Sequence, residues 1–157
     1  MPEAEVGVEM TDEEITAFLT RQGHGVLSFA GEEPYSLPIS FGYDVLENRC
    51  IFQLVFHDES TKRERIASSS RVTLVSYEWR GPDDWRSVII DGDLRWIDDE
   101  SPEVLDASEV FAEYASLAGL AVFDRPTPDL DPEWYELEIE SMSGRHAPAV
   151  ASIDAIE

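Results

Sequence analysis

The sequence predicts a mainly β fold, α+β by its helix content, in which six antiparallel strands form a barrel with flanking helices. Short apolar or alternating segments recur at close spacing along the 157 residues, a pattern typical of an antiparallel barrel or sandwich. Helical patterns interrupt these segments at three places. The chain is 43% hydrophobic and contains four Trp, five Tyr and seven Phe, so it differs from disordered acidic chains and has enough apolar residues for one packed core.

N-capping patterns predict the helices. Thr11 and Glu14 form a capping box ahead of apolar residues at helical spacing, and Gly23 ends that helix. A second capping box begins at Thr61, and Ser101 precedes a proline at the first helical position. The predicted helices cover residues 11–22, 61–69 and 102–117.

Runs rich in β-branched and aromatic residues predict the strands. They cover residues 24–30, 35–43, 50–56, 71–79, 85–97 and 134–142, with loops at 81–84 and 119–132. Pro38 removes a ladder hydrogen bond, so its strand is expected at an edge of the sheet or distorted there. Gly92 marks a bulge or a close approach of two backbones.

The domain organisation follows from these elements. We expect an N-terminal arm over residues 1–10, one domain over 11–145 and a C-terminal tail over 146–157. The sequence contains no apolar run of 18 residues and no basic segment of the kind that begins a signal peptide. We therefore expect a cytoplasmic protein that does not span a membrane. Cys50, in a predicted strand, is expected to be a small buried hydrophobe.

The charge of the chain is strongly negative. It has 34 acidic and 11 basic residues, with ten Arg and a single lysine, Lys62, which gives a net charge of −23. Concentrated salt screens the self-repulsion of such a chain, so the composition indicates a salt-adapted protein. Nucleic acid is excluded as a partner because its phosphates require a basic surface.

The basic residues are concentrated in one stretch. Residues 60–86 contain six of the eleven bases and four acids. Lys62 lies in the first turn of the predicted helix 61–69, where free N–H groups and the helix dipole favour an anion. Ser60 and Thr61 add hydroxyl donors. The pattern fits an anion site, and it also fits a plain capping box with a solvated basic face.

Three segments resemble a known family. The segments PYSLPISFGYD, FHDESTKRERIASSSRVTLVSYE and WRSVIIDGDLRWID are similar, in this order, to strands and a turn of the pyridoxamine 5′-phosphate oxidase-like flavoproteins, especially their nitroimidazole-resistance-type branch. The resemblance covers about residues 11–99, with a weaker similarity in SMSGRHAP. It implies an FMN-binding split β-barrel that forms a homodimer with FMN at the interface.

The resemblance also implies site residues. Thr61 and Lys62, with Arg63, would bind the FMN phosphate, and Phe56 and His57 would lie beside the ribityl chain. The residues that would contact the flavin ring are Pro38, Ile39, Ser40 and Ser87. The flavin would exchange hydride with a small-molecule redox substrate or a nicotinamide cofactor. A flavin or haem carrier or sensor, and a deazaflavin-dependent reductase, are the alternatives on the same fold.

The sequence departs from the family at two sites. The turn between His57 and Lys62 is short, and the strand at 35–43 lacks the arginine of true pyridoxamine phosphate oxidases. Arg145 and His146 are the one candidate for the substrate-binding Arg and His of those enzymes, so vitamin B6 oxidation is not expected.

The remaining candidate residues indicate no further site. No two histidines have metal-ligand spacing, so no metal site is expected. His24 begins a strand and has no partner in the sequence pattern. The four tryptophans are expected to anchor the core and a dimer interface, and Trp85 is the one placed to touch a flavin ring.

Overall fold

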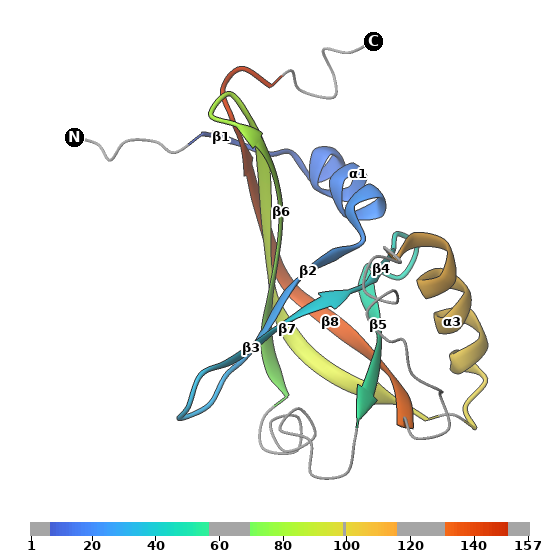
Figure 1. Cartoon of the computed structure of the whole chain (residues 1–157). Helices are drawn as coiled ribbons and strands as arrows, with labels where there is room; N and C mark the ends of the chain where they lie inside the picture. The colour runs from blue at the N-terminus through green and yellow to red at the C-terminus, as the bar shows by residue number, and fades with distance from the viewer. Residues whose placement is uncertain (1–6, 57–69, 99, 116–130, 151–157) are drawn as a thin grey trace.

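The computed structural model describes residues 7–56, 70–98, 100–115 and 131–150. Within these residues, eight strands form one antiparallel sheet, and two helices both contact β4 (Figure 1). The strands are β1 (Val8–Glu9), β2 (His24–Phe29), β3 (Tyr35–Ser40), β4 (Gly42–Asp44), β5 (Arg49–Phe56), β6 (Arg71–Gly81), β7 (Asp84–Ile97) and β8 (Asp131–His146). The helices are α1 (Asp12–Gln22) and α3 (Glu103–Tyr114). The mainly β, antiparallel prediction is confirmed, but the predicted number of six strands is wrong.

The first helix forms as its capping pattern predicts. Thr11 Oγ1 accepts a hydrogen bond from Glu14 N (3.2 Å), and Glu14 Oε1 accepts one from Thr11 N (2.8 Å). Gly23 ends the helix with φ 69°, a left-handed conformation that glycine adopts without strain. These two ends fix where α1 stops and β2 begins.

The order of strands explains the curvature of the sheet. The hydrogen-bonded order is β3-β2-β6-β7-β8-β5-β4, with β1 paired to β8. Its two outer strands, β3 and β4, are separated in the chain by one residue, Phe41. Because the chain connects these strands directly, the sheet must curl until its two ends approach each other, which gives the half-barrel in Figure 1.

The predicted strand 35–43 is therefore divided into two. Phe41 N donates to Gly23 O (2.9 Å), which continues the β2–β3 register by one pair, and from Gly42 the chain pairs with β5. The strand is divided because it changes partner at Phe41. β3 pairs with β2 alone among the described strands, which confirms the edge position predicted from Pro38.

The long strands β6, β7 and β8 form the centre of the sheet. Gly81 pairs with Asp84, so a turn of two residues replaces the loop predicted over 81–84. The β7–β8 register shifts between Asp91 and Gly92, as predicted for a bulge. A Cβ on Gly92 would collide with the carbonyl oxygen of Glu138, so the close approach of the two strands requires glycine there.

The last strand is longer than its sequence pattern predicts. β8 covers Asp131–His146, whereas residues 134–142 were expected. The pairing of β8 with β7 extends to His146, and β1 pairs with the same end of β8. Backbone pairing on both sides therefore sustains a strand where the side chains lose their apolar alternation.

Two buried clusters form the core. The larger joins Ile15, Phe18 and Leu19 of α1 to the inward side chains of the sheet. The smaller lies under α3 and contains Phe111, which packs edge-on against Trp134 (ring centroids 5.4 Å apart). Neither helix of the described part has the length and apolar content to cross a membrane.

The second described helix is shorter than predicted. It covers Glu103–Tyr114 where residues 102–117 were expected, and Ser101 Oγ accepts a hydrogen bond from Glu103 N (3.1 Å). The helix predicted over 61–69 and most of the loop predicted over 119–132 lie outside the described residues.

Candidate functional site

Five of the nine predicted site residues lie in described strands. They are Pro38, Ile39 and Ser40 in β3, Phe56 at the end of β5, and Ser87 in β7. The other four lie outside the described residues and are His57, Thr61, Lys62 and Arg63. Phe56 is described through its backbone, which pairs with Asp131 of β8.

The three residues of β3 divide between two faces of the sheet. Alternate side chains of a strand point to opposite faces, so Pro38 and Ile39 face opposite ways. Ile39 packs against the main buried cluster, whereas Pro38 is exposed. Ile39 can therefore reach a ligand outside the barrel through its backbone alone.

Pro38 belongs to a row of neighbours that crosses five strands. The strand register pairs Pro38 with Val26, Val26 with Val75, Val75 with Ile89, and Ile89 with Ser143. Residues paired across antiparallel strands share a face. Pro38 and Ile89 are thus three strand spacings, about 15 Å, apart on the outside of the barrel.

Ser87 lies on the same outer side, two residues from Ile89. Its cross-strand partner is Tyr77, and Trp79 pairs with Trp85 beyond it. Tyr77 and Trp79 are large and exposed, at 58% and 61%, and Ile89 is 44% exposed. We call this surface the open face, defined by Ser36, Pro38, Ser40, Val26, Ser28, Val75, Tyr77, Trp79, Trp85, Ser87 and Ile89.

None of these eleven side chains is charged, although the chain has 34 acidic residues. Charged groups on the same side of the sheet lie at the border of the open face, namely Asp91, which pairs with Thr73, and Arg145, which pairs with Ser87, and His24 pairs with Ser40. A largely uncharged and partly apolar surface on so acidic a protein marks an interaction site. It brings together Pro38, Ser40 and Ser87, which the sequence predicted. It also includes Tyr77 and Ile89, which sequence reasoning missed.

The missed residues had a signal in the sequence. From Thr73 to Trp79 every second residue of β6 is uncharged, whereas the alternate positions run from the buried Val72 and Leu74 to Glu78 and Arg80. This alternation identifies one outward uncharged side of the strand.

The tryptophans differ in burial. Trp134 packs against the cluster under α3, as expected of a core anchor. Trp79 and Trp96 are exposed, at 61% and 51%, so neither is a core residue of this chain. Trp85 is half-buried on the open face, next to Ser87.

Arg145 and His146 do not form a joint site. They are consecutive in β8, so their side chains point to opposite faces. Arg145 donates to Gly7 O (3.2 Å) on the exposed side, whereas His146 is buried with its Nε2 3.8 Å from Glu14 Oε2. Arg145 and His146 therefore cannot bind one substrate together in a single pocket.

Two further reactive side chains, Cys50 and His24, form no site with other reactive groups among the described residues. Burial raises the pKa of the Cys50 thiol far above its usual range, so this cysteine stays protonated, as its predicted core role requires. His24 is exposed at the start of β2, with Gln22 beside it. Among the described residues, no three His, Cys, Asp or Glu side chains are grouped to hold a metal ion.

A family model described as pyridoxamine 5′-phosphate oxidase matches residues 11–146. The chain belongs to this family. No curated protein matches the sequence. Solved structures resemble it, and the three described next are at most 21% identical to it in sequence.

Three of these structures illustrate the range. A FAD-binding protein from Mesorhizobium loti shares 21% identity over 91% of this chain and 99% of its own, with a TM-score of 0.72. A protein from Bacteroides thetaiotaomicron, described as a candidate 5-nitroimidazole antibiotic resistance protein, shares 14% identity over 88% of this chain and 86% of its own, with a TM-score of 0.65. A haem-binding protein from Mycobacterium smegmatis shares 13% identity over 86% of this chain and 54% of its own, with a TM-score of 0.61. These likenesses establish the split-barrel fold.

Proposed function

We propose that this protein binds FMN on the open face and acts as a flavin-dependent oxidoreductase. The observation that carries the proposal is the row Pro38–Val26–Val75–Ile89 on the outside of the sheet, which is apolar and has serine side chains beside it. A flat aromatic ring system with polar edges fits such a surface. The family and the flavin named in the Mesorhizobium loti structure support the choice of ligand.

Different residues would contact different parts of FMN. Pro38, Ser40 and Ser87 would lie against the ring. The outer edge of β3 has no strand partner among the described strands, so its backbone can offer hydrogen bonds to the ring edge. Bound FMN supplies hydride chemistry, and the protein supplies orientation and electrostatics. A nicotinamide cofactor or a small redox substrate would be the partner in the reaction.

The phosphate would bind beyond the end of β5. Thr61, Lys62 and Arg63 follow Phe56 in the chain, and the described chain returns at Ser70, where Ser70 O accepts a hydrogen bond from Leu94 N (2.7 Å). A lysine and an arginine in this segment are the cations that an otherwise acidic protein needs to neutralise a phosphate. Phe56 and His57 would flank the ribityl chain between the two parts.

The remaining part of the open face would be covered by a second copy of the chain. Tyr77, Trp79 and Ile89 leave a large apolar surface exposed in one chain. A two-fold dimer buries the same surface of both copies and is the commonest way to cover such a patch. We propose a cytoplasmic homodimer that encloses the flavin.

Replacing Lys62 by alanine tests the phosphate assignment. We expect FMN affinity to fall about tenfold or more, because a charge-assisted contact to phosphate is worth about 1.5–3 kcal/mol. Riboflavin, which lacks the phosphate, should lose almost none of its affinity. Flavin fluorescence titrations of both ligands measure this difference, and equal losses for FMN and riboflavin would rule out Lys62 as the phosphate ligand.

Haem is the second candidate ligand, because the Mycobacterium smegmatis haem-binding protein has the same fold. The two ligands are distinguished by absorbance, since FMN gives flavin bands and haem gives a Soret band. FAD is compared with FMN in the same titrations, because the Mesorhizobium loti protein is described with FAD.

The acidic composition predicts a dependence of stability on salt. With 34 acidic and 11 basic residues, self-repulsion should destabilise the fold when screening is removed. We expect the protein to lose its circular dichroism signal or to dissociate on dialysis from molar salt into dilute buffer. An unchanged spectrum and unchanged mass in dilute buffer would contradict salt adaptation.

A further inference from the structure

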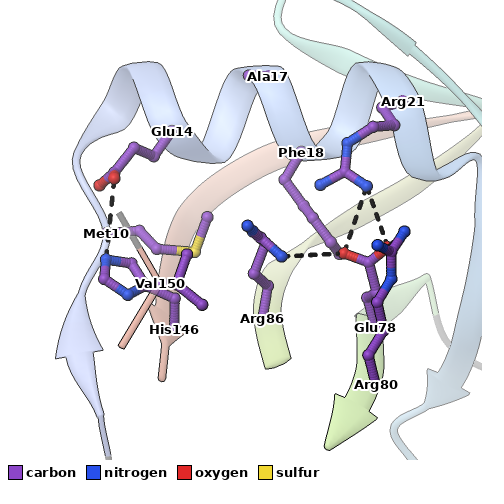
Figure 2. Close-up of a pocket in the computed structure, with 10 residues that line it drawn as sticks. All are labelled: Met10, Glu14, Ala17, Phe18, Arg21, Glu78, Arg80, Arg86, His146 and Val150. Atoms are coloured by element: carbon purple, nitrogen blue, oxygen red, sulfur yellow. Dashed lines mark hydrogen bonds and ion pairs between the residues drawn. The ribbon is translucent and has the colours of Figure 1, made fainter. Parts of the chain in front are cut away.

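A cavity of about 330 Å³ lies between α1 and the inner side of β6, β7 and β8 (Figure 2). Glu78 pairs with Arg86, and Arg86 pairs with His146, so these three side chains form one row across the sheet. The row faces α1. Ser87 and Tyr77, next to it in the same strands, face the opposite way. The cavity is therefore separated from the open face by the sheet itself.

Three arginines meet at one carboxylate in this cavity, as Figure 2 shows. Glu78 Oε2 accepts from Arg21 Nη1 (3.1 Å) and Arg80 Nη2 (3.0 Å), and Glu78 Oε1 accepts from Arg86 Nη1 (3.2 Å). The side chain of Glu78 is 12% exposed, so its carboxylate lies beneath the guanidinium groups, away from solvent. The negative charge of this carboxylate stabilises three cations that would otherwise repel one another.

The carboxylate of Glu78 is ionised at neutral pH. Burial by itself raises the pKa of Glu78, but the hydrogen bond from Arg21 and the charges of all three arginines outweigh it and hold that pKa below its usual range. Three arginines and two glutamates, Glu14 and Glu78, line the cavity, and Asp84 also accepts from Arg86 Nη1 (3.4 Å), so the charges of the cluster are balanced.

The arginines also keep donors available. Each guanidinium has five N–H groups. Within the described residues, the hydrogen bonds of Arg21, Arg80 and Arg86 involve one terminal nitrogen of each. The remaining N–H groups can meet a second carboxylate in the planar, two-point geometry that guanidinium favours.

Away from the arginines the lining is mixed. Met10, Ala17, Phe18 and Val150 are apolar, Glu14 and His146 lie 3.8 Å apart at the far end, and the guanidinium of Arg21 lies 5.3 Å from the centre of the Phe18 ring. The arginines thus suit an anionic head, and the apolar side chains suit a hydrocarbon or aromatic body. The volume of the cavity is at the lower limit of small-molecule sites.

We propose that this cavity is a second ligand site, which binds a small organic carboxylate with an apolar body. The carboxylate lies against Arg21, Arg80 and Arg86, and the body lies against Phe18 and Met10. The carboxylate would use the arginine N–H groups that Glu78 and Asp84 leave available. A doubly charged phosphate would meet stronger repulsion from Glu14 and Glu78 than a carboxylate with one charge.

The test uses benzoate and its neutral analogue benzamide in calorimetric titrations of the full chain at one fixed salt concentration. We expect saturable binding of one benzoate per chain and much weaker binding of benzamide. Arg80→Gln should weaken benzoate binding about tenfold, which corresponds to about 1.4 kcal/mol. Arg80 is 65% exposed, so the variant should fold like the wild type.

Arg71→Gln is the matched control, because it removes the same charge at the other end of β6, where Arg71 pairs with Glu140. It should leave benzoate affinity unchanged. Equal affinities for benzoate and benzamide, or equal losses in Arg80→Gln and Arg71→Gln, would overturn the proposal.

A second variant gives a change of the opposite sign. Glu78→Gln removes the carboxylate that competes for the arginines, so benzoate should bind more tightly even though the folded state becomes less stable. A cluster with a purely structural role would lose stability and show no gain in benzoate affinity, and that result would also overturn the proposal.

Discussion

Replacing Arg49 by methionine is expected to lower the free energy of unfolding by about 3–5 kcal/mol, because it leaves the buried carboxylate of Asp44 without this counter-charge and removes one of the two arginines that pair with Glu136. Arg49 Nε donates to Asp44 Oδ2 (2.9 Å) and Arg49 Nη1 to Glu136 Oε1 (3.1 Å). All three side chains are buried, at 7–10% exposure. A third bond, from Arg49 Nη2 to Asp106 Oδ2 (2.9 Å), ties α3 to the sheet.

The guanidinium of Arg49 stays protonated in this site. Burial lowers its pKa, but hydrogen bonds and the charges of Asp44 and Glu136 outweigh burial and raise the pKa above its usual value. Methionine keeps the approximate length of the side chain and removes the charge and the donors. The loss therefore reports the ion network more than the packing.

Arg95→Met is the matched control. Arg95 also pairs with Glu136, but its side chain is 42% exposed, so the loss should stay near 1 kcal/mol or below. Urea unfolding followed by circular dichroism measures both variants. Equal losses, or a loss below about 1 kcal/mol for Arg49→Met, would show that the network is not what holds α3 to the sheet.

Replacing Phe41 by alanine is expected to cost about 3–5 kcal/mol, the usual penalty for truncating a buried phenylalanine. Phe41 is fully buried and packs edge-on against Phe52 (ring centroids 6.4 Å apart). It is also the single residue that joins β3 to β4, at the two ends of the sheet. For a chain of this size, the loss lowers the melting temperature by about 10 °C or more.

Leu46→Ala provides the comparison for Phe41→Ala, because Leu46 is 94% exposed in the turn after β4. Its melting temperature should equal that of the wild type. Calorimetry of both variants measures the difference. If Phe41→Ala melted within about 2 °C of the wild type, the junction between β3 and β4 would not be an essential part of the core.

The elements with local signals were predicted well. The capping box at Thr11 and the glycine at residue 23 determine both ends of α1, because they supply the hydrogen bonds that the helix ends lack. Gly92 was predicted as a bulge from one glycine in a long strand. Pro38 was placed at an edge because it lacks a backbone donor.

The elements that depend on partners were not predicted. The strand pattern of residues 35–43 is continuous, so nothing local indicates that the chain leaves β2 at Phe41 and pairs with β5 from Gly42. The extension of β8 to His146 relies on pairing with β7 and β1, because Ser143 and Gly144 have weak strand preference.

The same distinction applies to the two sites. Pro38, Ser40 and Ser87 were expected from family resemblance, and simple alternation places them on one face. The open face as a whole required the register of four strands. The arginine cavity could not be predicted, because Arg21 is 57 residues from Glu78, and charge counting along the chain does not show that they meet.

The most direct test of the central claim, that flavin binds on the open face, is FMN titration of the wild type and the Ile89→Arg variant. Ile89 and Leu105 are both exposed apolar residues, the first on the open face and the second on α3, so Leu105→Arg is the matched control. We predict that the wild type and Leu105→Arg bind FMN with equal affinity. Ile89→Arg should bind at least about tenfold more weakly, since a charge at this position is buried at a cost when the ring and the second copy of the chain cover the open face. Equal FMN affinity in all three proteins, or no FMN binding to the wild type, would contradict the account.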